Sequence, residues 1–287
     1  MKIKIGTRKS KLALVQTQMV ADRISEKFPN AKIEIVHINT MGDKILDKPL
    51  TSIGGKGVFV SEIEKALQNK AIDIAVHSAK DLPVCLAEGL EISGVLNRGN
   101  YRDVLVSRKG TAVNNISNFI IGTGSLRRRL NLKKIYANVN FKDIRGNVDT
   151  RLNKLENGEY DAIILAMAGL ERLGLNKDER FDFKSFDYTE FLPAPCQGII
   201  AIESRQNDFV TPIINQINDK NTFLSFETEK HILKLLNADC GMPLGAYSFV
   251  ENDKISLVLS KDSDKAVSGF DNVTNRLKLV EELISKL

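Results

Sequence analysis

The stretch AIDIAVHSAKDLP, residues 71–83, decides the fold. Its apolar first half predicts a buried strand that ends at His77. Polar Ser78, Lys80 and Asp81 follow at the carboxyl end of this strand, and a Leu-Pro pair then stops the run on a stiff turn. Open α/β sheets bind ligands at the carboxyl ends of their strands, so this edge is a candidate site. A surface ion pair between the lysine and the aspartate is the alternative interpretation.

Short apolar runs on both sides of this stretch alternate with helical patterns. Further strands are predicted at residues 2–6, 32–38, 103–107, 119–122, 161–167 and 198–203. Helices are predicted at residues 57–70, 125–136 and 148–157. Ser10 is predicted to cap another helix, whose apolar stripe includes Leu12, Val15 and Met19. This βαβ rhythm is typical of α/β proteins with mixed, mostly parallel sheets covered on both faces.

Segments rich in glycine and proline indicate where the chain passes between lobes. Residues 96–103 and 191–198 are candidates for two such crossings. Two crossings leave one lobe discontinuous, as in the two-lobed body of periplasmic binding proteins. A helix at residues 221–237, two strands at 246–250 and 255–260 and a closing helix follow. We therefore predict two periplasmic-binding-protein-like α/β lobes and a small C-terminal α+β domain.

Composition restricts the class of protein. Of the 287 residues, 43% are hydrophobic and 27% are charged, the balance of an ordinary globular protein. No apolar run reaches the roughly 20 residues that span a bilayer, and the first residues lack the apolar core of a signal peptide, so we expect a cytoplasmic protein. The three cysteines and three histidines follow no metal-ligand spacing, so neither a disulfide scaffold nor a metal site is expected.

A second candidate site is FIIGTGSLRRRL, residues 119–130. A strand runs into a Gly-Thr-Gly turn, and Ser125 is a natural N-cap for the helix that carries Arg127, Arg128 and Arg129. A helix N-terminus offers free N–H groups and the positive end of the helix dipole. Arginine forks bind carboxylate or phosphate through two parallel hydrogen bonds. A solvated basic helix face is the alternative, but the glycine-rich entry favours an anion site.

Arginine recurs at other strand ends. Arg145 ends a predicted strand, and Arg151 lies in the first turns of the next helix, where positive charge opposes the helix dipole. Arg8 and Arg172 follow two further strands. Five strand-end segments are thus predicted to direct arginine toward a shared crevice. A ligand with many negative charges is the simplest explanation.

Two other stretches are less specific. IGGKGVFVSE, residues 53–62, resembles a phosphate loop but fails its pattern, because glycine instead of serine or threonine follows Lys56. We expect instead a flexible lid that carries Lys56 and Phe59. Cys240 lies in a predicted helix-to-strand loop. A lone cysteine is more often a small buried hydrophobe than a nucleophile.

Eight motifs occur together in one order along the chain. They are TRKS (7–10), GGKG (54–57), VHSAKDLP (76–83), GTGSLRR (122–128), RGNVDTR (145–151), AGLERLGL (168–175), PAPCQG (193–198) and the loop Cys240. In this order and approximate spacing the chain resembles the porphobilinogen deaminases over nearly its whole length. Any one motif is only suggestive, whereas eight in order are highly specific.

The resemblance implies a reaction and a cofactor. The family condenses four porphobilinogen molecules head to tail, releases ammonia at each step and yields hydroxymethylbilane for haem synthesis. The product grows on a dipyrromethane cofactor, attached by a thioether to a cysteine that matches Cys240. Asp81 matches the catalytic aspartate, which is expected to assist loss of the amino group and to stabilise the azafulvene cation left behind.

The resemblance also implies binding residues and domain boundaries. Contacts to the cofactor are expected from Ser78, Lys80, Thr123, Ser125, Arg127, Arg128, Arg145 and Gly146. Contacts to substrate are expected from Arg8, Ser10, Arg145, Arg151, Arg172 and Gln197. Each pyrrole brings two carboxylates, so the growing chain needs many cationic partners. The implied first lobe is residues 1–96 with 197–216, the second is 97–196, and a C-terminal domain at 217–287 carries the cofactor cysteine in a monomer.

Three positions depart from the family pattern. Cys196 stands where the family usually has glycine, and a positive φ there would strain the turn. Gly124 replaces a usual serine, and Ser52 replaces a second lysine in the expected lid. None of these changes touches the aspartate or the attachment cysteine, so we expect them to affect turnover and loop closure and not the class of reaction.

Two rival functions remain open at this point. A non-catalytic anion-binding protein of the same fold would explain the arginines but not Asp81 or Cys240. A nucleic-acid-binding protein is the second rival. It is disfavoured because aromatic residues are only 6% of the chain, with none among Arg127–Arg129 on which bases could stack.

Overall fold

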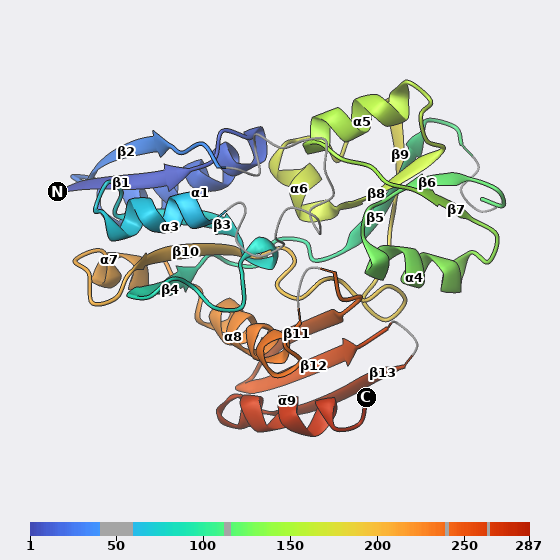
Figure 1. Cartoon of the computed structure of the whole chain (residues 1–287). Helices are drawn as coiled ribbons and strands as arrows, with labels where there is room; N and C mark the ends of the chain where they lie inside the picture. Colours follow the sequence, from blue (N-terminus) through green and yellow to red (C-terminus); the bar gives the residue numbers. More distant parts are fainter. Residues whose placement is uncertain (41–59, 112–115, 239–240, 263–264) are drawn as a thin grey trace. The chain divides into compact units, whose positions relative to one another are not determined.

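The computed structural model describes five ranges of the chain, which Figure 1 shows in colour. They are residues 1–40, 60–111, 116–238, 241–262 and 265–287. Within them the chain forms two compact units. Unit 1 contains residues 1–98 and 199–238, and unit 2 contains residues 99–198 and 241–287.

Unit 1 is built on a five-stranded sheet with the order β2-β1-β3-β10-β4. Its strands are β1 (Lys2–Thr7), β2 (Lys32–His37), β3 (Ile74–Ser78), β4 (Leu90–Val95) and β10 (Ile200–Arg205). Its helices are α1 (Lys11–Lys27), α3 (Ser61–Gln68), the short η2 (Ala79–Asp81), α7 (Thr211–Asn215) and α8 (Lys220–Leu235).

Unit 2 contains a five-stranded sheet with the order β7-β6-β8-β5-β9 and a three-stranded sheet with the order β11-β12-β13. The first consists of β5 (Asp103–Arg108), β6 (Ile120–Gly122), β7 (Asn140–Lys142), β8 (Ala162–Ala166) and β9 (Phe181–Ser185), with helices α4 (Leu126–Ile135), α5 (Val148–Glu156) and α6 (Met167–Arg172). The second consists of β11 (Gly245–Glu251), β12 (Lys254–Ser260) and β13 (Ala266–Asn272), followed by η3 (Val273–Asn275) and α9 (Arg276–Ile284).

The two five-stranded sheets share one pattern of strand directions. In unit 1, β2, β1 and β3 pair in parallel, and β10 is antiparallel to both β3 and β4. In unit 2, β7, β6 and β8 pair in parallel, and β5 is antiparallel to both β8 and β9. Four strands of each sheet therefore run in one direction and the fifth runs against them. The predicted fold is confirmed: two α/β lobes with mixed, mostly parallel sheets and a small C-terminal sheet domain.

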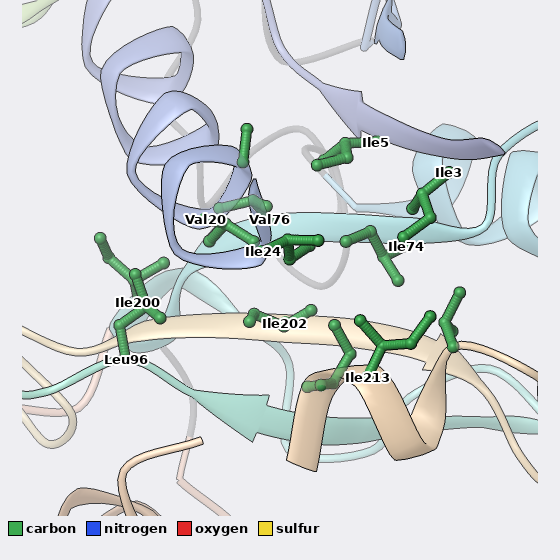
Figure 2. Packing of buried hydrophobic residues seen from close by; sticks show 13 residues of the cluster. Ile3, Ile5, Val20, Ile24, Ile74, Val76, Leu96, Ile200, Ile202 and Ile213 are labelled. Atoms are coloured by element: carbon green, nitrogen blue, oxygen red, sulfur yellow. The ribbon is translucent and has the colours of Figure 1, made fainter. Parts of the chain in front are cut away.

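Helices cover both faces of each large sheet, as the apolar strand runs predict. On one face of the unit 1 sheet, Figure 2 shows Val20 and Ile24 of α1 against Ile74 of β3, with Ile202 of β10 and Ile213 of α7 in the same cluster. The other face packs on α3. In unit 2, α5 and α6 cover one face and α4 the other. Burial of these side chains, worth roughly 1.5–3 kcal/mol each, fixes the strands whose ends carry the site.

Two details differ from the sequence prediction. The stripe expected on α1 is wrong, since Met19 is 37% exposed and the buried face consists of Gln16, Thr17, Val20, Ala21 and Ile24. The buried face includes two polar side chains that are hydrogen-bonded: Gln16 bonds to Ser78 of β3, and Thr17 Oγ1 donates to the Ala13 carbonyl of its own helix. Three strands were also not predicted from the sequence: β4, β9 and the third strand of the C-terminal sheet, β13.

Candidate functional site

The predicted residues of unit 1 gather at one edge of its sheet. β1 and β3 are parallel neighbours, so their carboxyl ends lie side by side. Arg8 and Ser10 follow β1, and Ser78, Lys80 and Asp81 end or follow β3. Ser10 caps α1 as predicted, accepting the Ala13 N–H at 3.3 Å. Such an edge is where open α/β sheets bind ligands.

Asp81 lies on a braced turn. It is exposed at the end of η2, whose own closing bond runs from the Leu82 N–H to the Ala79 carbonyl at 3.3 Å. The Ala79 N–H donates to the Ile199 carbonyl at 3.0 Å. One residue earlier, Ser78 exchanges hydrogen bonds with Gln16 of α1 at 2.9 and 3.2 Å. The carboxylate is thus presented to solvent from a backbone that is closed by its own hydrogen bond and fixed on its N-terminal side.

A buried hydrogen-bonded pair of side chains follows from the pairing of β3 with β10. His77 Nε2 is 2.8 Å from Glu203 Oε2 of β10, and the Glu203 side chain is fully buried. The other oxygen of Glu203 has no hydrogen-bond partner within the described ranges. Burial, opposed by a hydrogen bond from the Ala87 N–H and reinforced by the Glu203 charge, raises the pKa of Glu64 on α3. This pair, which the sequence analysis missed, fixes β3 next to the turn that bears the aspartate.

In unit 2 the predicted residues gather at the equivalent edge, after β6, β7 and β8. Ser125 caps α4 and accepts the Arg128 N–H at 3.4 Å, and its own N–H donates to Thr123 Oγ1 at 3.2 Å. Gly124 is exposed, and a Cβ there would meet only Asp143 Oδ1, at 3.8 Å. The turn would therefore accept the serine that the family usually has.

Arg127 and Arg128 are buried, so the alternative of a solvated basic helix face is wrong for them. Both guanidiniums lie on Asp103 at the start of β5: Arg127 Nη1 is 2.8 Å from Oδ2, and Arg128 Nη2 is 2.7 Å from Oδ1. They also donate to the carbonyls of Leu192 and Ile164. Burial, opposed by the Asp103 charge, lowers the pKa of Arg127. Two cations share one carboxylate, so the pair favours an additional anion.

Arg145 and Arg151 are half-buried and lie on either side of a glycine turn. Arg151 Nε donates to the Gly146 carbonyl at 2.8 Å. Gly146 has φ +110°, and a Cβ there would stand 2.8 Å from Thr150 Cγ2, so only glycine fits. The turn fixes both arginines at the end of β7.

Arg172 ends α6 and reaches the chain beside the last predicted crossing. Its Nη2 donates to the Gly198 carbonyl at 2.6 Å, and burial lowers its pKa to about 10. Gln197 donates to the Tyr101 carbonyl at 2.7 Å. Cys196 is buried with φ +62°, so the strain expected from a residue other than glycine is present.

Four residues named from the sequence, Ser52, Lys56, Phe59 and Cys240, lie outside the described residues. Of the other predicted site residues, five lie in unit 1 and the rest lie in unit 2. That the arginines of both units face one shared crevice stays a prediction. Within the described ranges no helix is long and apolar enough to cross a bilayer.

Comparison with known proteins identifies the family. Residues 3–211 match the family model described as porphobilinogen deaminase, dipyromethane cofactor binding domain. The chain is 46% identical to the porphobilinogen deaminase of Acetivibrio thermocellus over 258 residues, which are 90% of this chain and 86% of that protein. The chain belongs to the porphobilinogen deaminase family.

A second relative extends the match. The probable porphobilinogen deaminase of Methanocaldococcus jannaschii is 42% identical over 296 residues, 99% of both chains. Among solved structures, the periplasmic VFT2 domain of Bordetella pertussis BvgS has a TM-score of 0.45 and 14% identity, covering 75% of this chain and 86% of that domain.

Family membership brings the reaction and the cofactor. As a porphobilinogen deaminase, the chain is an enzyme of tetrapyrrole synthesis that joins porphobilinogen units, with dipyrromethane as its cofactor. The residues fit such a polycarboxylate: Arg127 and Arg128 share one carboxylate, and the N-terminus of α4 adds the positive end of a dipole. Arg145 and Arg151 are partly accessible beside them.

Proposed function

We propose that Asp81 is the catalytic carboxylate of the condensation. Its exposure on a hydrogen-bonded turn carries the proposal, because a carboxylate on a fixed backbone needs little reorganisation as positive charge develops on the substrate. When the aminomethyl carbon of porphobilinogen loses ammonia, the cation left behind is stabilised by this fixed negative charge. The same carboxylate can accept a proton from a pyrrole N–H or hold one for the departing amine.

The test replaces only the charge. Asp81→Asn keeps the shape of the side chain, and we expect a loss of at least about a hundredfold in turnover, the scale of one preorganised electrostatic group. Thermal stability should change little because the side chain is exposed. Asp22→Asn, which alters an exposed aspartate on α1, is the matched control. Substantial activity in Asp81→Asn would exclude the role.

The carboxylate side chains of the pyrroles are assigned to the cationic residues of each unit. In unit 1 these are Arg8 and Lys80, with Ser10 and Ser78 as polar contacts. In unit 2 they are Arg127, Arg128, Arg145, Arg151 and Arg172, with Thr123, Ser125, Gly146 and Gln197. Partial burial of most of the arginines strengthens their pairing with carboxylates, since the local dielectric is lower than in water.

Dipyrromethane, when bound, supplies the primer to which porphobilinogen units are added. We propose that it is attached through Cys240, and that Cys196 and Cys85 are not attachment residues. Cys196 is 1% exposed, so its thiol presents little surface to a ligand. Intact-mass measurement of the denatured protein should find an increment of two pyrrole units on the Cys240 peptide. Cys240→Ser should remove it and Cys196→Ser should keep it, and the reverse outcome would exclude the assignment.

The remaining assignments follow the family resemblance. We propose a monomer that works in the cytoplasm and binds no nucleic acid, with Lys56 and Phe59 on a lid and with the three-domain boundaries given above. Light scattering tests the monomeric state. Salt-dependent binding to arbitrary DNA would contradict the absence of nucleic-acid binding. Protein that never forms a covalent pyrrole when given porphobilinogen would favour the non-catalytic anion binder instead.

A further inference from the structure

Helix α8 connects the Asp81 turn to the rest of unit 1. The Lys230 ammonium of this helix is 2.9 Å from the Leu82 carbonyl and 3.4 Å from the Pro83 carbonyl, the two residues that directly follow Asp81. We propose that Lys230 is a positioning residue that fixes the carboxylate of Asp81 for turnover. This inference rests on the proposed catalytic role of Asp81.

The contact ties two successive backbone carbonyls to one side chain. Leu82 and Pro83 directly follow Asp81, and both carbonyls accept from the Lys230 ammonium, which carries enough donors for both. Charge-assisted hydrogen bonds of this kind are stronger than neutral ones, so the lysine restrains the backbone on the far side of Asp81.

The helix that carries the lysine is itself immobilised. Glu229, the preceding residue, is fully buried and holds Arg98 through two bonds of 2.7 and 3.2 Å. At the other end, Asp219 caps the helix by accepting the Thr222 N–H at 2.8 Å. Lys230 thus fastens the turn to a fixed helix on the C-terminal side of Asp81. The Ala79 hydrogen bond holds the turn on the N-terminal side of Asp81.

A positioning role predicts a particular kinetic signature. The lysine contacts backbone and not the carboxylate itself, so its loss should change how well Asp81 is aimed and not how substrate is bound. Misplacement by about 1 Å can lower a rate about a hundredfold. We expect kcat to fall about tenfold to a hundredfold in Lys230→Met while KM for porphobilinogen stays within about twofold. Lys230→Arg, which keeps charge and donors, should recover most of kcat.

The experiment uses the full-length enzyme loaded with its cofactor. Activity is expressed per covalently modified chain, counted by intact mass, so that a change in loading is not taken for a change in turnover. Lys234→Met removes an exposed lysine four residues further along the same helix and should behave as wild type. If Lys230→Met does not fold, Lys230→Gln, which keeps a neutral donor, replaces it in the same comparison.

The outcomes separate the two proposals. A lowered kcat with unchanged KM and rescue by arginine supports the inference. An unchanged kcat, a raised KM with unchanged kcat, or failure of arginine to rescue a folded, loaded enzyme overturns it. If Asp81→Asn is inactive while Lys230→Met is fully active, only the positioning inference fails. If Asp81→Asn is fully active, the proposed function fails and this inference with it.

Discussion

Cys196 offers a test of backbone strain. Alanine is usually more stabilising than glycine, but at this position we expect Cys196→Gly to be more stable than Cys196→Ala. Its φ of +62° lies in the left-handed region, where a residue with a Cβ is disfavoured by about 1–2 kcal/mol. Glycine avoids this cost but loses roughly 0.5–1 kcal/mol more conformational entropy on folding than alanine. The difference leaves Cys196→Gly more stable than Cys196→Ala by roughly 0.5–1 kcal/mol. Comparing these two variants removes the sulfur from both sides of the comparison.

The assay is thermal unfolding of both variants, with a reference pair in the same unit. A difference of about 1 kcal/mol corresponds to roughly 2–4 °C in Tm for a chain of this size class. Ala162 is fully buried at the start of β8, outside the left-handed region. There we expect the ordinary order, with Ala162→Gly less stable than wild type.

The reasoning is refuted if Cys196→Ala is as stable as Cys196→Gly or more stable. That result would mean that the turn relaxes out of the left-handed region at no cost. The Gly198 carbonyl, two residues after Cys196, accepts a hydrogen bond from Arg172. A change in the backbone at Cys196 should therefore move Arg172 and alter turnover.

Three further outcomes follow from contacts described above. Asp103→Asn leaves two buried guanidiniums without a counter-charge and should lower the free energy of unfolding by about 3–5 kcal/mol in denaturant titrations; a loss below about 1 kcal/mol would contradict the shared ion pair. Burial, followed by a hydrogen bond to a carboxylate, raises the pKa of Tyr101 from 10.0 to about 12, so its contribution to stability is complete below pH 10 and is lost as the pH rises toward about 12. Tm measured across this window should therefore fall more steeply in wild type than in Tyr101→Phe, and equal slopes would contradict the shift. Gly146→Ala combines a φ of +110° with a Cβ at 2.8 Å from Thr150, whereas at Gly158 φ is +78° and no atom lies near a Cβ. We therefore expect Gly146→Ala to lower Tm more than Gly158→Ala does. Equal decreases in Tm would show that the contact with Thr150 is not destabilising.

The strongly patterned elements of the fold were predictable and several edge strands were not. The sequence places β1, β2 and α4 almost to the residue, because apolar and polar residues alternate along the two strands and the Ser125 cap marks the start of the helix. The three strands that were missed, β4, β9 and β13, all lie at the edge of a sheet. An edge strand has a neighbour on one side only and is less enclosed, so it needs fewer apolar residues and leaves a weaker pattern.

The candidate site divides in the same way. Strand-end residues such as Asp81 and Arg145 follow a local rule, and their positions could be predicted. Their supporting partners could not, because Glu203 lies 126 residues from His77 and Asp103 lies 25 residues from Arg128. Each of these carboxylates occupies an ordinary strand position, and only the folded sheet order brings it next to its partner.

The strand β10 has a consequence for synthesis on the ribosome. β5 to β9 are contiguous between residues 103 and 185, so the unit 2 sheet can close as soon as that segment has emerged. The unit 1 sheet cannot, because β4 is hydrogen-bonded within its sheet only to β10, which appears about a hundred residues later. The N-terminal segment, although translated first, must wait with β3 and β4 unjoined until the later lobe is complete. A nascent chain halted before residue 200 would thus carry the Asp81 turn on an unfinished sheet.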